Sequence, residues 1–200
     1  MTIEINAQKI EDMLAAPQVE REDYQAFVKN LFKAGPAILA DLSLQVDPAA
    51  LGRLHAVIGM VGECHELQNA TSKENWVEEM GDIAFYFEAL TQSTDWWVVL
   101  ERYKDQFNAN LTMLDISCEL LDLCKKETMY AKPLDGPKQD RFYVLMSSFI
   151  EVFENTLNEW GSSMQEIARH NVEKLGKKRY PGAVYSNEAA AARLDKIGEE

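Results

Sequence analysis

Two pairs of carboxylates stand close together between Gly59 and Asp82, a stretch with six acidic residues and one lysine. Glu63 and Glu66 form the first pair, and Glu79 and Asp82 form the second, with the same spacing of three residues. Residues three apart share one face of an α-helix. If two such faces meet in a partly dry interior, the negative charges repel one another unless protons or cations offset them. The spacing therefore predicts a divalent metal site between two helices.

The chemistry of the donor atoms narrows the choice of ion. Carboxylate oxygens without histidine or thiolate favour hard ions, so Mg²⁺ is the expected cofactor and Mn²⁺ the second option. A di-iron bundle needs a Glu-x-x-His pattern, whereas His65 lies two residues from Glu63, on another side of the helix. An acidic face exposed to solvent is the remaining alternative, and the absence of lysines four residues from these carboxylates weakens it.

Helices are the elements that must position these carboxylates. Asp47 followed by Pro48 is typical of a helix N-terminus, and apolar residues then keep helical spacing toward Leu67. A Ser or Thr at positions 71–72 caps a second helix, which runs from Trp76 to about Gln92. The two predicted helices carry one carboxylate pair each.

Helical periodicity dominates the rest of the chain too, and strand-like alternation is almost absent. Further helices are predicted at about 24–32, 96–130, 140–160 and 163–177, with a break at 35–36, a loop at 133–137 and an irregular tail from Tyr180. The predicted fold class is therefore all-α, a helical bundle.

Composition limits the classes of partner. Two hundred residues with 46% hydrophobic content can bury a core. The formal charge of −13 repels phosphate backbones and anionic lipids, so neither a nucleic acid polymer nor a membrane is expected as a partner. Without a basic and apolar leader or a long apolar run, and with three cysteines expected to be free thiols, a cytoplasmic location is predicted.

The carboxylate pattern resembles that of the MazG-type all-α nucleotide pyrophosphohydrolases, the group that includes dimeric dUTPases and phosphoribosyl-ATP pyrophosphohydrolases. The stretch 62–67 (Gly-Glu-x-x-Glu-Leu) followed by 78–82 (Glu-Glu-x-Gly-Asp) is similar to the family's Glu-x-x-Glu, spacer, Glu-x-x-Asp signature. Residues 167–181 (Ile-x-x-x-Asn-x-x-Lys-Leu-x-x-x-Arg-Tyr-Pro) resemble the segment that closes many phage and bacterial members.

A second, degenerate family unit is implied by the long stretch between these motifs. Residues 119–135 resemble the family's continuation, Glu-Leu-x-Asp-x-x-Lys-Lys and its loop. Matching the two units places Ile116, Leu145 and Ser148 where the first unit has carboxylates, although helical amphipathicity alone can produce such a match. The resemblance implies a MazG/dimeric dUTPase bundle of two tandem units packed as a pseudo-dimer: an extension (1–21), a first unit with the metal carboxylates (22–95), a second unit (96–182) and a tail (183–200).

The family reaction implied by the resemblance converts a nucleoside triphosphate, ribose or deoxyribose, to the monophosphate and pyrophosphate with a metal-activated water. Glu63, Glu66, Glu79 and Asp82 would hold Mg²⁺, and Glu78 or one of these ligands would accept the proton of the water. Basic and polar residues of the second unit would bind the remaining phosphate charge: Lys125, Lys126, Tyr130, Lys132, Asn171, Lys174 and Arg179. Family members commonly form dimers, so a homodimer is expected.

Base recognition has only aromatic candidates, which equally suit a core: Trp76, Phe85, Tyr86, Trp96 and Trp97. Two alternatives to an enzyme stay open. One is a non-catalytic module that senses nucleotides or binds a partner, and the other is a helical scaffold with an exposed acidic stripe. A sensor gains nothing from clustered unpaired carboxylates, which favours the hydrolase.

Overall fold

The computed structural model describes residues 29–31, 33, 35–45, 47–108, 110–180, 182 and 184–192. The chain divides into two compact units, Met1–Leu39 and Ala40–Glu200. In the first unit, the described part is helical at 29–31 and in the beginning of α3 (Gly35–Gln45). The predicted extension 1–21, positions 24–28 and 32 of the predicted N-terminal helix, and the tail at 183 and 193–200 lie outside the described residues.

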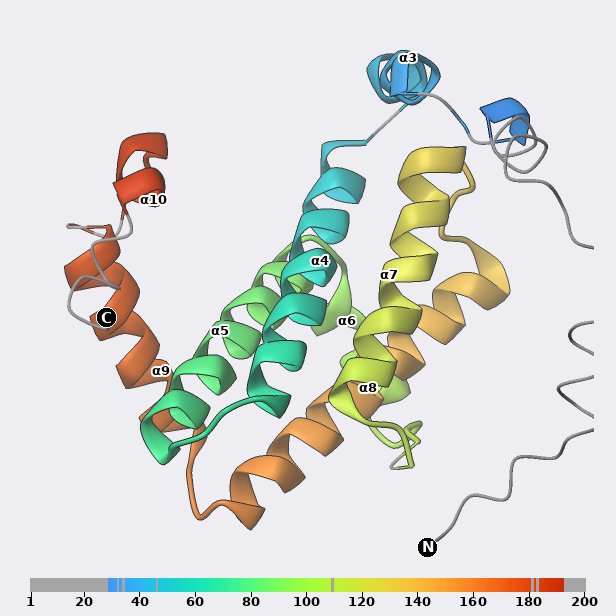
Figure 1. The fold of residues 1–200 in the computed structure, drawn as a ribbon. Coiled ribbons are helices and arrows are strands. Elements are labelled where there is room, and N and C mark those ends of the chain that lie inside the picture. Colours follow the sequence, from blue (N-terminus) through green and yellow to red (C-terminus); the bar gives the residue numbers. More distant parts are fainter. Residues whose placement is uncertain are drawn as a thin grey trace, which may run out of the picture. The chain divides into compact units, whose positions relative to one another are not determined.

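The second unit is an all-α bundle, which confirms the predicted fold class (Figure 1). Its described residues contain no strand. In chain order the helices are α4 (Pro48–Gln68), α5 (Lys73–Gln92), α6 (Trp96–Tyr103), α7 (Met113–Tyr130), α8 (Gly136–Glu159), α9 (Met164–Glu173), the π-helix η1 (Lys174–Arg179) and α10 (Asn187–Ala192). Figure 1 shows α4 between α5 and α7, while α8 packs on α7 and α9 packs on α5.

The two helices that carry the carboxylate pairs are capped as the sequence predicts, although α5 begins at Lys73 rather than at Trp76. The Asp47 carboxylate accepts a hydrogen bond from the Ala49 backbone N–H at 3.1 Å, and Pro48 occupies the first turn of α4. The Ser72 hydroxyl accepts one from the Asn75 N–H at 3.1 Å and caps α5. Each cap satisfies a backbone donor that has no partner within the helix.

The single helix predicted over 96–130 is wrong, because α6 ends at Tyr103 and α7 begins at Met113. The new start is fixed by a capping box, in which Thr112 Oγ1 accepts from the Asp115 N–H at 3.1 Å and Asp115 Oδ2 accepts from the Thr112 N–H at 3.0 Å. Two other helices differ at their ends. Helix α8 begins at Gly136 because Pro137 fits a first turn, and α9 changes into the π-helix at Lys174.

Helices α4 and α7 run antiparallel through the centre of this unit. The pairs Arg53–Glu127 and Cys64–Ser117 join the two helices, so residue numbers fall along one helix as they rise along the other. The core between α4, α5, α7 and α8 consists of fully buried side chains, among them Met60, Met80, Ile83, Leu90, Ile116, Leu120, Leu145, Met146 and Phe149. All three cysteines are free thiols, as predicted. Within the described residues, no helix is both long enough and apolar enough to cross a bilayer.

Candidate metal centre

Three of the four predicted ligands converge between α4 and α5. Glu63, Glu79 and Asp82 each place one carboxylate oxygen within 4.8 Å of the others. Glu79 is buried with 3% of its surface exposed, and the other two are half-buried. Glu66, the fourth predicted ligand, is exposed and lies outside this trio. The geometry therefore gives a three-carboxylate centre with one further carboxylate near it.

Amide groups orient two members of the trio. Asn75 Nδ2 donates to Glu79 Oε1 at 2.7 Å, one turn away on α5. Asn171 Nδ2, from α9, donates to Asp82 Oδ1 at 3.0 Å. Helix α9 comes this close because residue 81 is glycine, where a Cβ would lie 3.3 Å from the Asn171 Cβ. Two different helices thus fix the directions in which the oxygens point.

The carboxylates of the centre carry more negative charge than their surroundings offset. Burial, together with repulsion from Asp82, Glu66 and Glu79, raises the pKa of Glu63 from 4.5 to about 7. Burial likewise raises the pKa of Glu79, with Glu66 adding to the effect. A cation placed among the three oxygens would relieve this repulsion. The all-oxygen donor set fits hard ions such as Mg²⁺ or Mn²⁺.

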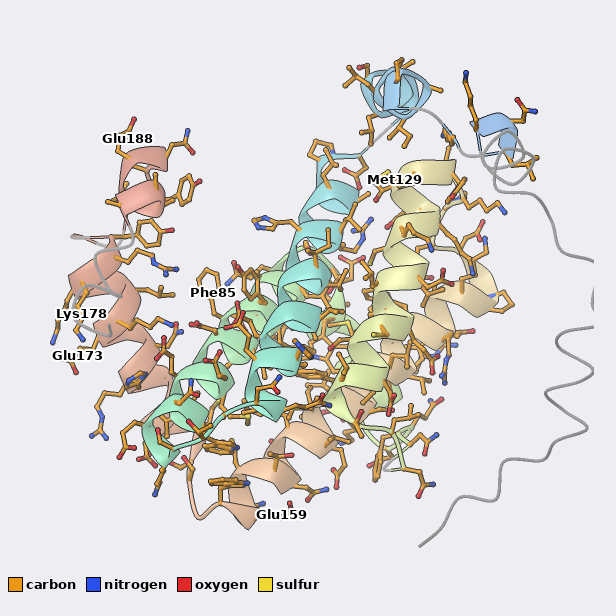
Figure 2. The ribbon with its side chains drawn as sticks, viewed as in Figure 1. Phe85, Met129, Glu159, Glu173, Lys178 and Glu188 are labelled. Atoms are coloured by element: carbon orange, nitrogen blue, oxygen red, sulfur yellow. The ribbon has the colours of Figure 1, made fainter. Side chains whose placement is uncertain are left out.

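A cavity of about 570 Å³ opens beside the centre, with Glu63 and Asp82 on its wall. Aromatic residues of α5 and of the C-terminal segment form much of the rest, together with the Arg179 side chain. Figure 2 shows Phe85 projecting from α5 toward this segment. Its neighbour Tyr86 lies flat against α4 because residue 59 is glycine, where a Cβ would be 2.4 Å from the Tyr86 ring. Such a volume with aromatic walls suits a small organic ligand.

No family model matches the chain, and neither a curated protein nor a solved structure matches it. Any functional assignment therefore depends on the residues of this chain.

The predicted phosphate-binding residues fall into two groups in the structure. Asn171, Lys174 and Arg179 lie at the carboxylates or in the cavity wall. The other four sit along or just after the C-terminal end of α7 and do not line the cavity: Lys125, Lys126, Tyr130 and Lys132. At this end of α7, Glu127 pairs with Arg53, which precedes Glu63 by ten residues or about 15 Å of helix. The structure therefore does not bring these four together with the carboxylates.

Lys125 and Lys126 have a nearer partner. Lys125 Nζ lies 3.2 Å from Asp122 Oδ1, and Lys126 Nζ contacts Asp122 Oδ2. All three side chains are close to half exposed. These contacts are exposed ion pairs within one helix, which contribute little to stability.

The five aromatic candidates separate in the same way. Phe85 and Tyr86 line the cavity. Trp76 stacks on Trp160 with ring centres 4.9 Å apart, Trp96 is fully buried, and Trp97 is exposed on another part of the surface. Only the first two are placed to contact a ligand beside the carboxylates.

Three residues with aromatic rings in the cavity wall were not predicted as functional from the sequence: His55, Tyr180 and Tyr185. His55 lies edge-on to Tyr86, with ring centres 6.2 Å apart. A signal for His55 existed, since it precedes Glu63 by eight residues and so lies on nearly the same side of α4. The rings of the two tyrosines are tilted against each other by 41°, with centres 5.6 Å apart, and neither tyrosine belongs to a regular helix, so periodicity gives no signal.

Proposed function

We propose that the protein is a Mg²⁺-dependent nucleoside triphosphate pyrophosphohydrolase, which converts a nucleoside or deoxynucleoside triphosphate to the monophosphate and pyrophosphate. The observation that carries the proposal is the convergence of Glu63, Glu79 and Asp82 within 4.8 Å, beside a cavity of about 570 Å³ whose wall includes Glu63 and Asp82. The resemblance of 62–67 and 78–82 to the MazG-type signature supports the same reaction.

Each part of the cavity has a role in this reaction. The trio holds the metal, and Glu66 beside it is available for a water-mediated contact. Bound Mg²⁺ would offset phosphate charge and lower the pKa of an attacking water. Arg179 of η1 binds the phosphate chain, because a guanidinium pairs with phosphate oxygens through two donors. Phe85 and Tyr86 provide ring faces for the base.

The resemblance allows either Glu78 or one of the metal ligands as the acceptor of the water's proton. Glu78 Oε1 lies 2.7 Å from Lys174 Nζ, so the Glu78 carboxylate is already engaged by an ammonium group. Glu66 is exposed beside the trio and outside it. We therefore assign proton acceptance to Glu66.

The tandem arrangement is part of the same proposal. Helices α4 and α5 form one hairpin of 21 and 20 residues, and α7 and α8 form a second of 18 and 24 residues. The two hairpins pack through α4 and α7. The carboxylate trio lies in the first hairpin, and the described residues show no comparable group in the second. This supports a pseudo-dimer in which one unit has kept the metal ligands.

The test is release of pyrophosphate from a panel of nucleoside triphosphates with Mg²⁺, with a chelator as the blank. Glu79→Gln keeps the shape of the side chain and should lower turnover on the order of a hundredfold or more, since it removes a metal ligand. Glu88→Gln is the matched control, because Glu88 is an exposed glutamate of the same helix. It should turn over like the unaltered protein.

Two outcomes would contradict the proposal. Release of pyrophosphate that persists in Glu79→Gln would place the activity elsewhere or in a contaminant. Nucleotides that raise the melting temperature without being hydrolysed would instead indicate the sensing module.

A further inference from the structure

Lys174 is a buried lysine that touches the metal centre directly. It is the first residue of η1, and only 6% of its surface is exposed. Its Nζ lies 2.5 Å from Asp82 Oδ2 and 2.7 Å from Glu78 Oε1. Asp82 belongs to the carboxylate trio, whereas Glu78 does not. The ammonium group therefore bridges one proposed metal ligand and one carboxylate outside the metal site.

Lys174 lies where α9 passes into the π-helix η1, three residues after Asn171 and so on the same face of the helix. In a π-helix the backbone bonds join residues five apart, as in the 2.7 Å bond from the Tyr180 N–H to the Leu175 carbonyl. Residues five apart then lie nearly above one another, whereas in an α-helix they lie about 140° apart. Lys174 and Arg179 are five apart; Lys174 contacts Asp82, and Arg179 lines the cavity that Asp82 also lines. The wider turn thus brings Lys174 and Arg179 to the same side of η1.

Burial of an ammonium group is unfavourable unless carboxylates compensate it. Asp82 and Glu78, each with an oxygen within 2.7 Å of the Lys174 Nζ, supply this compensation. Lys174 is therefore a fixed positive charge in a cluster where carboxylates predominate. A divalent ion at the trio would have to share Asp82 with it.

We propose that Lys174 is a built-in cation that competes with the divalent ion for Asp82, and that Glu78 holds the lysine when the ion is bound. The inference rests on the proposed function only for the presence of a metal at the trio. It makes Lys174 a positioning residue that sets metal affinity, rather than a ligand for phosphate. Glu78 acts through Lys174 and takes no part in proton transfer.

The two roles of Lys174 predict different measurements. A phosphate-binding lysine affects the KM for nucleotide and leaves metal affinity in the absence of nucleotide unchanged. A competing cation affects metal affinity when no nucleotide is present. Mn²⁺ serves as the probe, since it takes the same oxygen ligands as Mg²⁺ and its binding is followed by electron paramagnetic resonance.

The experiment titrates Mn²⁺, without nucleotide, into four proteins: the unaltered chain, Lys174→Met, Glu78→Gln and the double variant. Lys174→Met should bind Mn²⁺ about tenfold more tightly, because Asp82 no longer has a competing partner. Glu78→Gln should bind more weakly, since the lysine then has only Asp82. In the Lys174→Met background, Glu78→Gln should lose most of its effect, which a double-mutant cycle measures.

Lys174→Arg keeps the charge and should bind Mn²⁺ like the unaltered protein, so it controls for damage to folding. Unchanged Mn²⁺ affinity in Lys174→Met, with a raised KM for nucleotide, would overturn the inference and leave the hydrolase intact. Tighter Mn²⁺ binding in Lys174→Met without turnover of any nucleotide would support the inference and contradict the proposed hydrolase. An unaltered protein that binds no Mn²⁺ would overturn both.

Discussion

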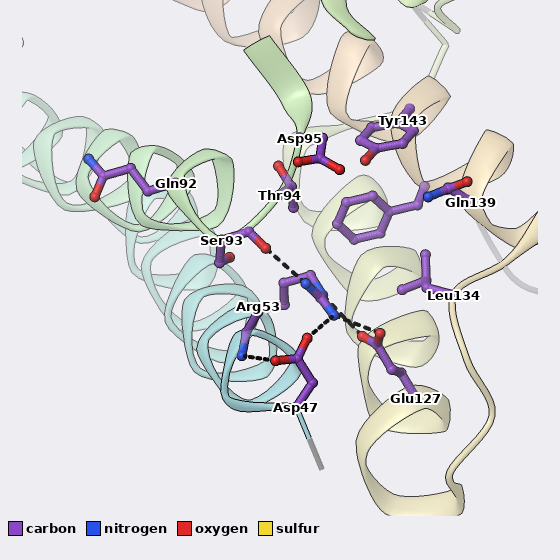
Figure 3. Close-up of a pocket in the computed structure, with 12 residues that line it drawn as sticks. Asp47, Arg53, Gln92, Ser93, Thr94, Asp95, Glu127, Leu134, Gln139 and Tyr143 are labelled. Atoms are coloured by element: carbon purple, nitrogen blue, oxygen red, sulfur yellow. Dashed lines mark hydrogen bonds and ion pairs between the residues drawn. The ribbon is translucent and has the colours of Figure 1, made fainter. Parts of the chain in front are cut away.

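Carboxylates are buried at two places along α4, and the chain treats them differently. At Arg53, the guanidinium donates from Nε and Nη2 to the two oxygens of Glu127, at 3.1 and 2.7 Å, and from Nη1 to the Ser93 carbonyl at 2.8 Å (Figure 3). Both charged side chains are only 14% and 13% exposed. At the other place, the carboxylates of Glu63, Glu79 and Asp82 lie close together, and Lys174 contacts Asp82.

The difference lies in how the negative charge is balanced. A bidentate arginine matches one carboxylate in both charge and geometry, so the Arg53–Glu127 pair is complete by itself. In the trio, Lys174 pairs with Asp82 and not with Glu63 on α4 or Glu79 on α5. The pKa of Glu63 rises to about 7 as a result of burial and repulsion. A balanced ion pair stabilises the fold, whereas carboxylates in excess of their cations favour binding of a further cation. Four changes test this contrast.

The largest effect is expected where the complete pair is broken. Arg53→Met removes the guanidinium and leaves Glu127 buried without its partner, which should lower the free energy of unfolding by about 3 kcal/mol. Urea denaturation measures the loss. Metal affinity should not change, because Arg53 is ten residues, or about 15 Å, from Glu63 along α4.

The control removes both charges. Arg53→Met combined with Glu127→Met should recover much of the stability, because no buried charge then remains unpaired. If the double variant is less stable than Arg53→Met alone, the Arg53–Glu127 pair is not the reason for the loss.

A change of the opposite sign is expected in the trio. Glu79→Gln removes one of three neighbouring carboxylates and keeps the oxygen that accepts from Asn75, so the metal-free protein should gain about 1 kcal/mol of stability. The same variant should lose the rise in melting temperature that Mg²⁺ gives the unaltered protein. Thermal unfolding with a chelator and with excess Mg²⁺ measures both effects. A destabilised Glu79→Gln in chelator would show that the cluster is balanced without an ion.

The helices that hold the trio were predictable because their signals are local. Asp47–Pro48 and Ser72 mark the beginnings of α4 and α5, and a spacing of three residues puts Glu79 and Asp82 on one face. The Thr112–Asp115 capping box was also present in the sequence, but continuous periodicity concealed it.

The partners across helices were not predictable in the same way. Periodicity tells which face of a helix is buried and not which residue from a distant helix meets it. The charge of Lys174 predicts a phosphate contact, whereas in the structure its Nζ contacts Asp82 and Glu78 of α5. A π-helix has no clear local signal, and neither has the cavity wall formed by the irregular segment around Tyr180.

A third and smaller effect concerns pH. Glu63 is only half-buried, and its pKa is about 7 in the folded protein against an ordinary 4.5. Between these values the folded state binds a proton that the unfolded state has lost. Without metal, stability should therefore fall as pH rises from about 4.5 to about 7. Mg²⁺ requires the ionised carboxylates, so the stabilisation that it adds should grow over the same range.

Melting temperatures across this range, in chelator and in Mg²⁺, test the expectation. Glu63→Gln removes the group, and the difference between its curve and that of the unaltered protein isolates the Glu63 contribution from other titrating residues. Identical slopes in the two proteins would mean that the Glu63 carboxylate is not under repulsion.

The smallest effect is expected for the lysines at the far end of α7. Lys125→Ala and Lys126→Ala each remove an exposed ion pair with Asp122, which should change the free energy of unfolding by less than about 0.5 kcal/mol. We also expect an unchanged KM for nucleotide, because this end of α7 lies beside Arg53 rather than Glu63. Arg179→Lys, on the cavity wall, is the positive control and should raise KM, since lysine cannot pair with phosphate through two donors. A raised KM for Lys125→Ala would mean that phosphate reaches α7 after all, and that the second hairpin contributes to substrate binding.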